Sequence, residues 1–200
     1  IIRKLKAMMQ NRVGASIFQP YRDLMKLFRK ETVVSENASF LFRAIPLVCI
    51  TSMVLLAAMT PFIYSGVAAP YADVIAMVYI FTMFRFAMVL GGLEGGSAFG
   101  GMGSSREAMM SVLIEPALLI SIMTLSAMTG AGFDISEISS SIIGAGAAAI
   151  SPALLLAGTS FLITMVAENT RVPFDNPDTH LELTMVHEGM LLEYSGKGLA

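Results

Sequence analysis

Long uncharged apolar segments are the feature that most constrains the fold of this chain. No charged residue occurs between Arg43 and Asp73, a gap longer than the ~20 residues that a helix needs to cross a bilayer. Of the 200 residues, 55% are hydrophobic and 14% are charged, whereas about a quarter of the residues in a soluble domain carry a charge. The sequence therefore predicts an all-α polytopic membrane protein in which residues 1–200 form a single membrane domain.

Four apolar segments are long enough to be membrane spans. Two of them contain one charged residue each, and Pro46 and Pro152 fall near the starts of the first and the last, where neighbouring helices can satisfy the freed backbone groups. The predicted spans are residues 44–63, 74–93, 108–129 and 147–167. Because the chain begins with Ile and no signal-peptide pattern opens it, we expect it to be an internal portion of a longer protein.

The distribution of Lys and Arg predicts the orientation of the spans. The predicted loops at residues 64–73 and 131–146 contain neither Lys nor Arg. Every Lys and Arg outside the spans lies in the N-terminal region, in the predicted loop at residues 94–107 or in residues 168–200. Cytoplasmic loops carry the excess of basic residues. We therefore expect a multi-pass protein of the cell membrane with both ends of this chain in the cytoplasm.

Residues 1–43 form a basic segment that holds nine of the thirteen Lys and Arg residues. Within it, Ile17, Tyr21, Leu24, Met25 and Phe28 recur at spacings of three and four, with most charged residues on the other side. This pattern is typical of an amphipathic helix at a membrane surface. The helix either anchors the chain to lipid headgroups or forms a docking platform for a soluble partner.

Two charged residues interrupt the predicted spans. Arg85 lies in the middle of the second span and Glu115 about two turns into the third. A central Arg costs about 2.5–3.5 kcal/mol to insert, so it is expected to face the bundle interior and pair with an acid, with Glu115 as the leading partner or proton carrier. The alternative is a static pair that fixes helix register.

Near the glycine-rich loop, Glu94, Arg106 and Glu107 form either the mouth of a polar path or solvated caps.

Ionisable residues are also dense directly after the fourth span. Acids and bases at the end of a membrane helix predict proton handling, although Glu168 and Arg171 alone could form a helix-end ion pair. His180 and His187 share one face if residues 179–194 are helical, and histidine can shuttle protons near neutral pH. The predicted proton-path residues in this segment are Glu168, Arg171, Asp175, Asp178, His180, Glu182, His187 and Glu193.

Several classes of site are disfavoured. The single cysteine, Cys49, cannot form an internal disulfide or a four-cysteine cluster. Gly91–Gly103 lacks the Gly-Lys-Ser/Thr ending of a Walker loop, and no His-Glu-x-x-His or Ser-His-Asp pattern is identifiable. We therefore predict no catalytic residue, no metal site and no cofactor in this chain. A net charge of −2 gives no support for nucleic-acid binding. The sequence shows no inverted repeat of the kind that many transporters contain, which disfavours a stand-alone transporter.

Two motifs occur after the fourth span: Ala167-Glu168-x-x-Arg171-x-Pro173-Phe174-Asp175, and then Leu192-Glu193-Tyr194-Ser195-Gly196. Together they resemble the signature of the complex I subunit 1 family. Further similarity lies at Gln10-Asn11-Arg12-x-Gly14, at Gln19-Pro20-Tyr21-x-Asp23-x-x-Lys26-Leu27, and at Gly92-Leu93-Glu94-x-Gly96-Ser97-x-Phe99 with Gly103-x-Ser105-Arg106-Glu107-Ala108 and Glu115-Pro116. The family includes the subunit that borders the quinone chamber of NADH:quinone oxidoreductase and its homologue in group 4 [NiFe]-hydrogenases such as formate hydrogenlyase.

One departure distinguishes the two branches. Complex I members carry a run of glutamates after Pro-Phe-Asp, where this chain reads Asn176-Pro177-Asp178-Thr179-His180-Leu181-Glu182-Leu183. The motifs that begin at Gly92, Gly103 and Glu115 look hydrogenase-type. The resemblance therefore favours the hydrogenase branch over a quinone-binding subunit.

The resemblance implies a membrane-anchor and proton-path subunit of a group 4 [NiFe]-hydrogenase or formate-hydrogenlyase-like complex. A nickel-iron centre and iron–sulfur clusters would then lie in partner subunits. The implied partners are the hydrogenase large and small subunits, an iron–sulfur subunit, antiporter-like membrane subunits and the lipid bilayer. Two alternatives stay open: a quinone-site subunit of complex I and a purely structural anchor.

Overall fold

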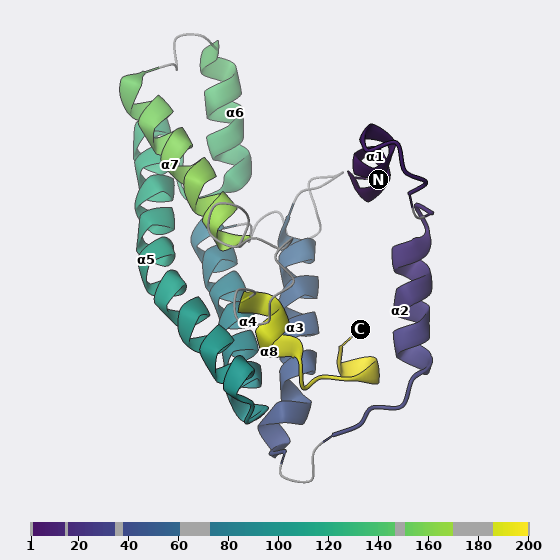
Figure 1. Cartoon of the computed structure of the whole chain (residues 1–200). Helices are drawn as coiled ribbons and strands as arrows, with labels where there is room; N and C mark the ends of the chain where they lie inside the picture. The colour runs from purple at the N-terminus through teal and green to yellow at the C-terminus, as the bar shows by residue number, and fades with distance from the viewer. Residues whose placement is uncertain are drawn as a thin grey trace.

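A bundle of apolar helices forms the body of the molecule (Figure 1). The computed structural model describes residues 2–14, 16–34, 38–60, 73–146, 151–169 and 186–199. The helices are α1 (Ile2–Met9), α2 (Gln19–Arg29), α3 (Phe40–Met59), α4 (Val74–Glu94), α5 (Ala98–Thr129), α6 (Ile135–Ala145), α7 (Pro152–Glu168) and α8 (Val186–Leu191), followed by the short 3₁₀ helix η3 (Gly196–Gly198). No strand occurs in these ranges, where a single bridge joins Asp73 and Asp134. The predicted all-α membrane fold is confirmed.

Within the described ranges, three helices, α3, α4 and α5, are long and apolar enough to cross a membrane. The fourth predicted span corresponds to α7, an apolar helix of 17 residues that begins at Pro152; residues 147–150 lie outside the described ranges. In sequence order through the bundle, α3 packs on α4, α4 on α5, and α5 on α7 (Figure 1). The short helix α8 packs across α4 and α5.

Capping side chains start each of the five helices α3 to α7. A Ser or Asp precedes each one and accepts a hydrogen bond from a backbone N–H of the first turn, the position where these residue types stabilise a helix most. The capping residues are Ser39, Asp73, Ser97, Asp134 and Ser151. At the other end of α5, Gly130 adopts φ +64°, a left-handed conformation that favours glycine as a helix stop.

The prediction of a loop at residues 94–107 is wrong. Only a short turn separates Glu94, which ends α4, from Ala98, which starts α5. The glycines of this region serve close helix packing: a Cβ on Gly100 would lie 2.4 Å from the carbonyl oxygen of Gly92, and one on Gly103 would lie 2.8 Å from that of Val186. With 32 residues, α5 is about 48 Å long, so it extends beyond a hydrocarbon core of ~30 Å.

The prediction of a loop at residues 131–146 is also wrong, because these residues contain a helix. There α6 begins after the Asp134 cap, and its apolar residues Ile135, Ile138 and Ile142 recur at helical spacing. With Phe161 of α7 they line an apolar pocket of about 370 Å³. Residues 61–72, most of the other predicted outer loop, lie outside the described ranges.

The predicted amphipathic segment contains α2, and none of the α2 residues is buried. Phe28 is 58% exposed and Tyr21 is 65% exposed. Figure 1 shows α2 standing apart from the bundle, where it contacts η3. The helix is therefore confirmed, while its position at a membrane surface stays a prediction.

Candidate functional site

Arg85 lies inside the bundle, as the sequence predicts. It is the one charged residue in the central turns of α4, and 4% of its surface is exposed. An arginine on an otherwise apolar helix avoids the cost of lipid exposure by turning toward polar partners on neighbouring helices. Arg85 and its partners are the buried charged residues in the described part of the bundle, and they form the candidate site.

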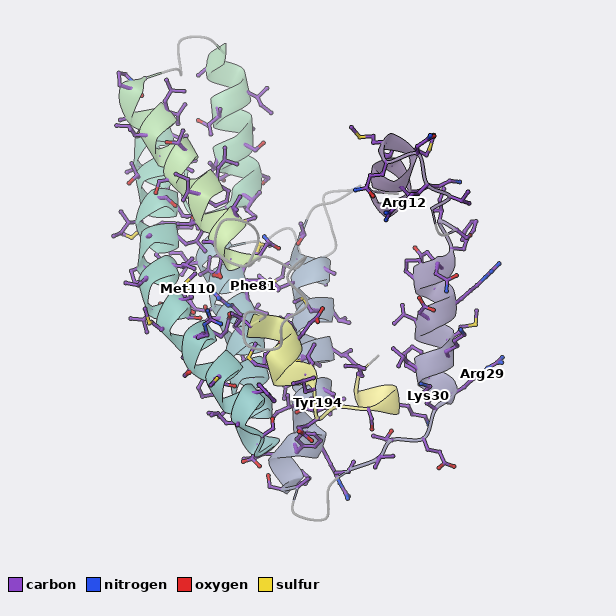
Figure 2. All side chains as sticks on the ribbon, viewed as in Figure 1. Arg12, Arg29, Lys30, Phe81, Met110 and Tyr194 are labelled. Carbon is purple, nitrogen blue, oxygen red and sulfur yellow. The ribbon has the colours of Figure 1, made fainter. Side chains whose placement is uncertain are left out.

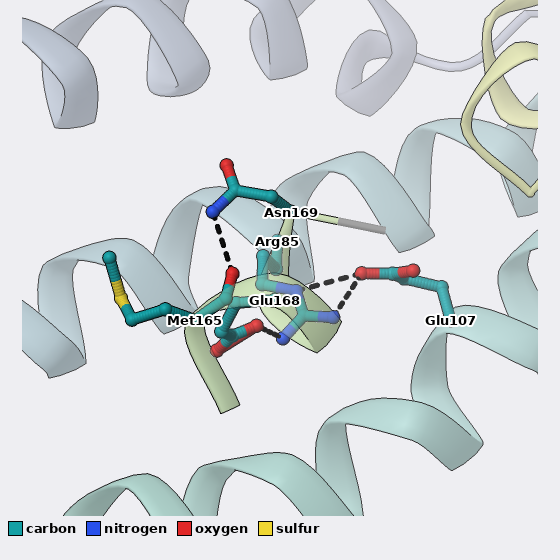
Figure 3. Close-up of polar contacts among 5 residues, drawn as sticks. All are labelled: Arg85, Glu107, Met165, Glu168 and Asn169. Atoms are coloured by element: carbon teal, nitrogen blue, oxygen red, sulfur yellow. Dashed lines mark hydrogen bonds and ion pairs between the residues drawn. The ribbon is translucent and has the colours of Figure 1, made fainter. Parts of the chain in front are cut away.

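Two buried carboxylates hold the Arg85 guanidinium (Figure 3). Its Nε donates to Oε1 of Glu107 over 2.7 Å, and its Nη2 donates to the same oxygen. Its Nη1 donates to Oε2 of Glu168. Glu107 is 1% exposed and Glu168 is 5% exposed. The cluster therefore joins three helices, α4 through Arg85, α5 through Glu107 and the last residue of α7 through Glu168.

The prediction that Arg85 pairs with Glu115 is wrong. Glu115 lies two turns beyond Glu107 on α5, about 12 Å further along the helix axis, so it occupies another depth. It is half-buried. The placement of Glu107 in a cytoplasmic loop is also wrong, because α5 starts at Ala98 and brings Glu107 into the bundle.

Among the described residues, the charges in the cluster do not balance. One guanidinium faces two carboxylates, and Oε2 of Glu107 is buried without a hydrogen-bond donor among the described residues. Burying an uncompensated negative charge is costly, and two nearby carboxylates tend to keep one proton between them. The geometry is suited to binding one exchangeable proton.

The remaining predicted residues divide into two groups. Glu94 is half-buried at the end of α4, Arg106 is exposed on α5, and Glu193 is exposed after α8. The side chain of Glu193 lies against Gly95, where a Cβ would come within 2.8 Å of its Cγ. Outside the described residues lie Arg171, Asp175, Asp178, His180 and Glu182, together with the side chain of His187. The described residues contain no cluster of metal-ligand side chains.

The Tyr194-Ser195-Gly196 motif has a structural role that spacing alone did not reveal. Tyr194 is 8% exposed and stacks on Phe42 of α3, with ring centroids 4.2 Å apart. Burial, followed by the nearby Cys49 and Glu94, raises the pKa of the Tyr194 phenol to about 12. The Tyr194 ring thus packs the segment after α8 against the start of α3.

Ser195 and Gly196 attach the same segment to the connection between α2 and α3. Ser195 Oγ accepts from the backbone N–H of Val33 over 2.9 Å and donates to the carbonyl oxygen of Val33 over 2.8 Å. Gly196 adopts φ +54°, and a Cβ there would lie 2.5 Å from the carbonyl oxygen of Glu31. Glycine is therefore required both by the conformation and by the close approach.

Comparison with known proteins identifies the family. A sequence model described as NADH dehydrogenase matches residues 1–200. This chain belongs to the NADH dehydrogenase subunit 1 family. Membership agrees with the resemblance carried by the Glu168 and Tyr194 motifs.

Two relatives are of the hydrogenase type. Hydrogenase-4 component C of Escherichia coli (strain K12) is 37% identical over 100% of this chain and 62% of its own length. Formate hydrogenlyase subunit 4 of the same organism is 34% identical over 99% of this chain and 63% of its length. An NADH-quinone oxidoreductase protein of Koribacter versatilis (strain Ellin345) is 32% identical over 97% of this chain and 49% of its length. The chain thus spans less than two thirds of the length of these relatives.

A solved structure supports the fold. The chain superposes on a chain of the membrane-bound sulfane sulfur reductase, an archaeal respiratory membrane complex, with a TM-score of 0.77 over 98% of this chain and 64% of the other. The two are 21% identical. The helix arrangement of this family member is therefore one found in a respiratory membrane complex.

Proposed function

We propose that this chain is the membrane-anchor and proton-path subunit of a group 4 [NiFe]-hydrogenase or formate-hydrogenlyase-like complex. The two hydrogenase-type relatives have higher identity to the chain than the quinone oxidoreductase relative. The single observation that carries the proton-path role is the buried cluster of Arg85, Glu107 and Glu168. An intramembrane group of ionisable residues with unbalanced charge is a candidate for ion movement.

The proposed path begins at the cytoplasmic end of α7. Protons enter near Glu168 and the acidic segment that follows it, and pass to the pair formed by Arg85 and Glu107. Arg85 favours the carboxylate forms of its partners, whereas burial opposes them. Glu115, deeper along α5, receives the proton next. The separation of about 12 Å along the helix is too long for a direct hydrogen bond, so bridging water would carry this step.

Electron transfer would occur in partner subunits on the cytoplasmic face. The nickel-iron centre and the iron–sulfur clusters are assigned to the hydrogenase large and small subunits and an iron–sulfur subunit, with antiporter-like subunits beside this chain in the membrane. The Lys and Arg distribution supports a cytoplasmic position for both ends of the chain. The surface available for redox partners then includes the starts of α3 and α5, α8 and η3.

Two experiments test this function. Mass spectrometry of the intact purified complex identifies the partners: a nickel-binding large subunit supports the hydrogenase assignment. Tight dependence of turnover on quinone would support the alternative, a quinone-reducing complex I subunit, which the similarity to the NADH-quinone oxidoreductase protein of Koribacter versatilis favours.

The proton path is tested in sealed vesicles with Glu115→Gln and Glu168→Gln. Each variant should assemble and retain electron transfer while proton translocation is lost. If both variants assemble normally and keep full coupling, the path is wrong and the chain is a structural anchor.

A further inference from the structure

An apolar groove lies between α3, α4 and η3, away from the Arg85 cluster. Its volume is about 410 Å³, within the range of roughly 300–1,000 Å³ that small-molecule sites occupy. Ile50 and Val54 of α3 form one wall and Phe84 of α4 another. Ile50 is 59% exposed and Val54 is 62% exposed, so the groove opens to the surface of the bundle at membrane depth.

One end of the groove is positively charged. Among the described residues that line it, Lys197 on η3 is the only charged one. The backbone of Lys30 is also close to η3: a Cβ on Gly196, next to Lys197, would lie 3.1 Å from the Lys30 carbonyl oxygen. Figure 2 shows Lys30 at the end of α2 beside η3. Glu31 follows Lys30 in the connection between α2 and α3, and it is the one acid among the described residues of that connection.

The groove therefore combines a long apolar wall with a cationic end. From Ile45 to Val54 the α3 wall extends for about 14 Å along the helix. The Lys197 end belongs to the segment expected at the cytoplasmic surface, where lipid headgroups lie. We propose that this groove binds one phospholipid with an anionic headgroup, its acyl chain along α3 and its phosphate at Lys197. A neutral amphiphile such as a quinone would supply no counter-charge to the Lys197 ammonium.

Cys49 provides a native probe of occupancy. It lines the groove, is half-buried, and is the single cysteine in these 200 residues. The intact complex is placed in nanodiscs of phosphatidylcholine alone or of phosphatidylcholine mixed with phosphatidylglycerol. The rate at which N-ethylmaleimide labels Cys49 is then followed by mass spectrometry of its peptide. Phosphatidylglycerol at about ten times its dissociation constant should slow labelling roughly tenfold, because labelling needs the empty groove.

Substitutions at the cationic end decide whether charge recognition is involved. Lys197→Gln should remove the protection by phosphatidylglycerol, whereas Lys197→Arg should keep it. Lys4→Gln, at an exposed cation of α1, is the matched control and should behave as the unchanged protein.

Four outcomes would overturn the proposal. They are equal labelling rates in both kinds of nanodisc, undiminished protection in Lys197→Gln, protection by added menaquinone instead of phosphatidylglycerol, and failure of Cys49 to react even in lipid-free detergent. The last result would mean that another protein segment covers the groove.

Discussion

Arg85 and Glu107 lie 22 residues apart in the chain, yet the Nε of Arg85 donates to Oε1 of Glu107 over 2.7 Å with both side chains buried. The contact joins α4 to α5: Arg85 precedes the short connection at residues 95–97, and Glu107 follows it. Because Glu168 of α7 holds the other side of the same guanidinium, one cation joins three helices. The stability of the bundle and the proposed proton path therefore depend on the same three side chains.

Removing the shared cation should destabilise the complex strongly. Arg85→Met leaves Glu107 and Glu168 buried without their partner, which costs about 3–5 kcal/mol for a broken buried pair. The thermal unfolding midpoint of the purified complex should fall well below that of the control Lys26→Met, at an exposed cation on α2.

A triple variant separates the cost of a lone charge from loss of packing. Arg85→Met combined with Glu107→Met and Glu168→Met should recover most of the lost stability, because an apolar replacement of a buried ionic group is often neutral or stabilising. An Arg85→Met protein as stable as the control would show that the three charges do not hold the helices together.

Close packing of α4 on α5 should tolerate no added methyl group at Gly92. A Cβ there would lie 2.3 Å from Oγ of Ser104 and 2.9 Å from Cγ of Met190. Gly92→Ala should therefore destabilise the protein by about 1–3 kcal/mol through overpacking.

Gly101 provides the matched control, since a Cβ at this α5 residue meets nothing within 4 Å. Gly101→Ala should raise stability by roughly 0.5–1 kcal/mol, because alanine favours a helix interior over glycine. Both values can be read from unfolding in denaturant. Equal effects at the two positions would argue against the packing described.

The two hydrogen bonds of Ser195 should hold the connection between α2 and α3 in place. Ser195→Ala removes both contacts to Val33, each worth about 1 kcal/mol. Hydrogen exchange at residues 30–34 should become faster. Ser105→Ala removes a hydroxyl that donates within its own helix to the carbonyl oxygen of Met102, and it should leave this exchange unchanged. Slow exchange retained in Ser195→Ala would mean that other contacts hold the connection.

Tyr194 should make stability fall at high pH. Its folded pKa of about 12 lies above the ordinary phenol value of ~10, so between these values the folded state keeps a proton that the unfolded state loses. The contribution is therefore complete below pH ~10 and is lost as pH rises toward 12. The unfolding midpoint of the unchanged protein should fall more steeply over this range than that of Tyr194→Phe. Tyr21→Phe, at a 65% exposed tyrosine, should retain the steep fall, and the same slope in Tyr194→Phe would contradict the assignment.

The sequence allowed the helices to be predicted better than their ends. The apolar segments carrying α3, α4, α5 and α7 and the inward position of Arg85 could be predicted, because both follow from the cost of placing charge in lipid. The extension of α5 to Ala98 could not, since glycine usually marks a turn and its role here depends on how closely α4 and α8 approach. The partner of Arg85 followed from that error: with Glu107 placed in a loop, Glu115 was the remaining acid on the helix.

The most direct test of the proton path is Glu107→Gln. Glutamine keeps the Oε1 acceptor that binds both Arg85 nitrogens and alters only the oxygen that lacks a donor among the described residues, so the fold should be preserved. Protons translocated per hydrogen evolved are measured in sealed vesicles, with Glu188→Gln on α8 as an exposed control. The account predicts that Glu107→Gln continues to evolve hydrogen with translocation lost and that the control is unchanged. Full translocation in an assembled Glu107→Gln complex would contradict it.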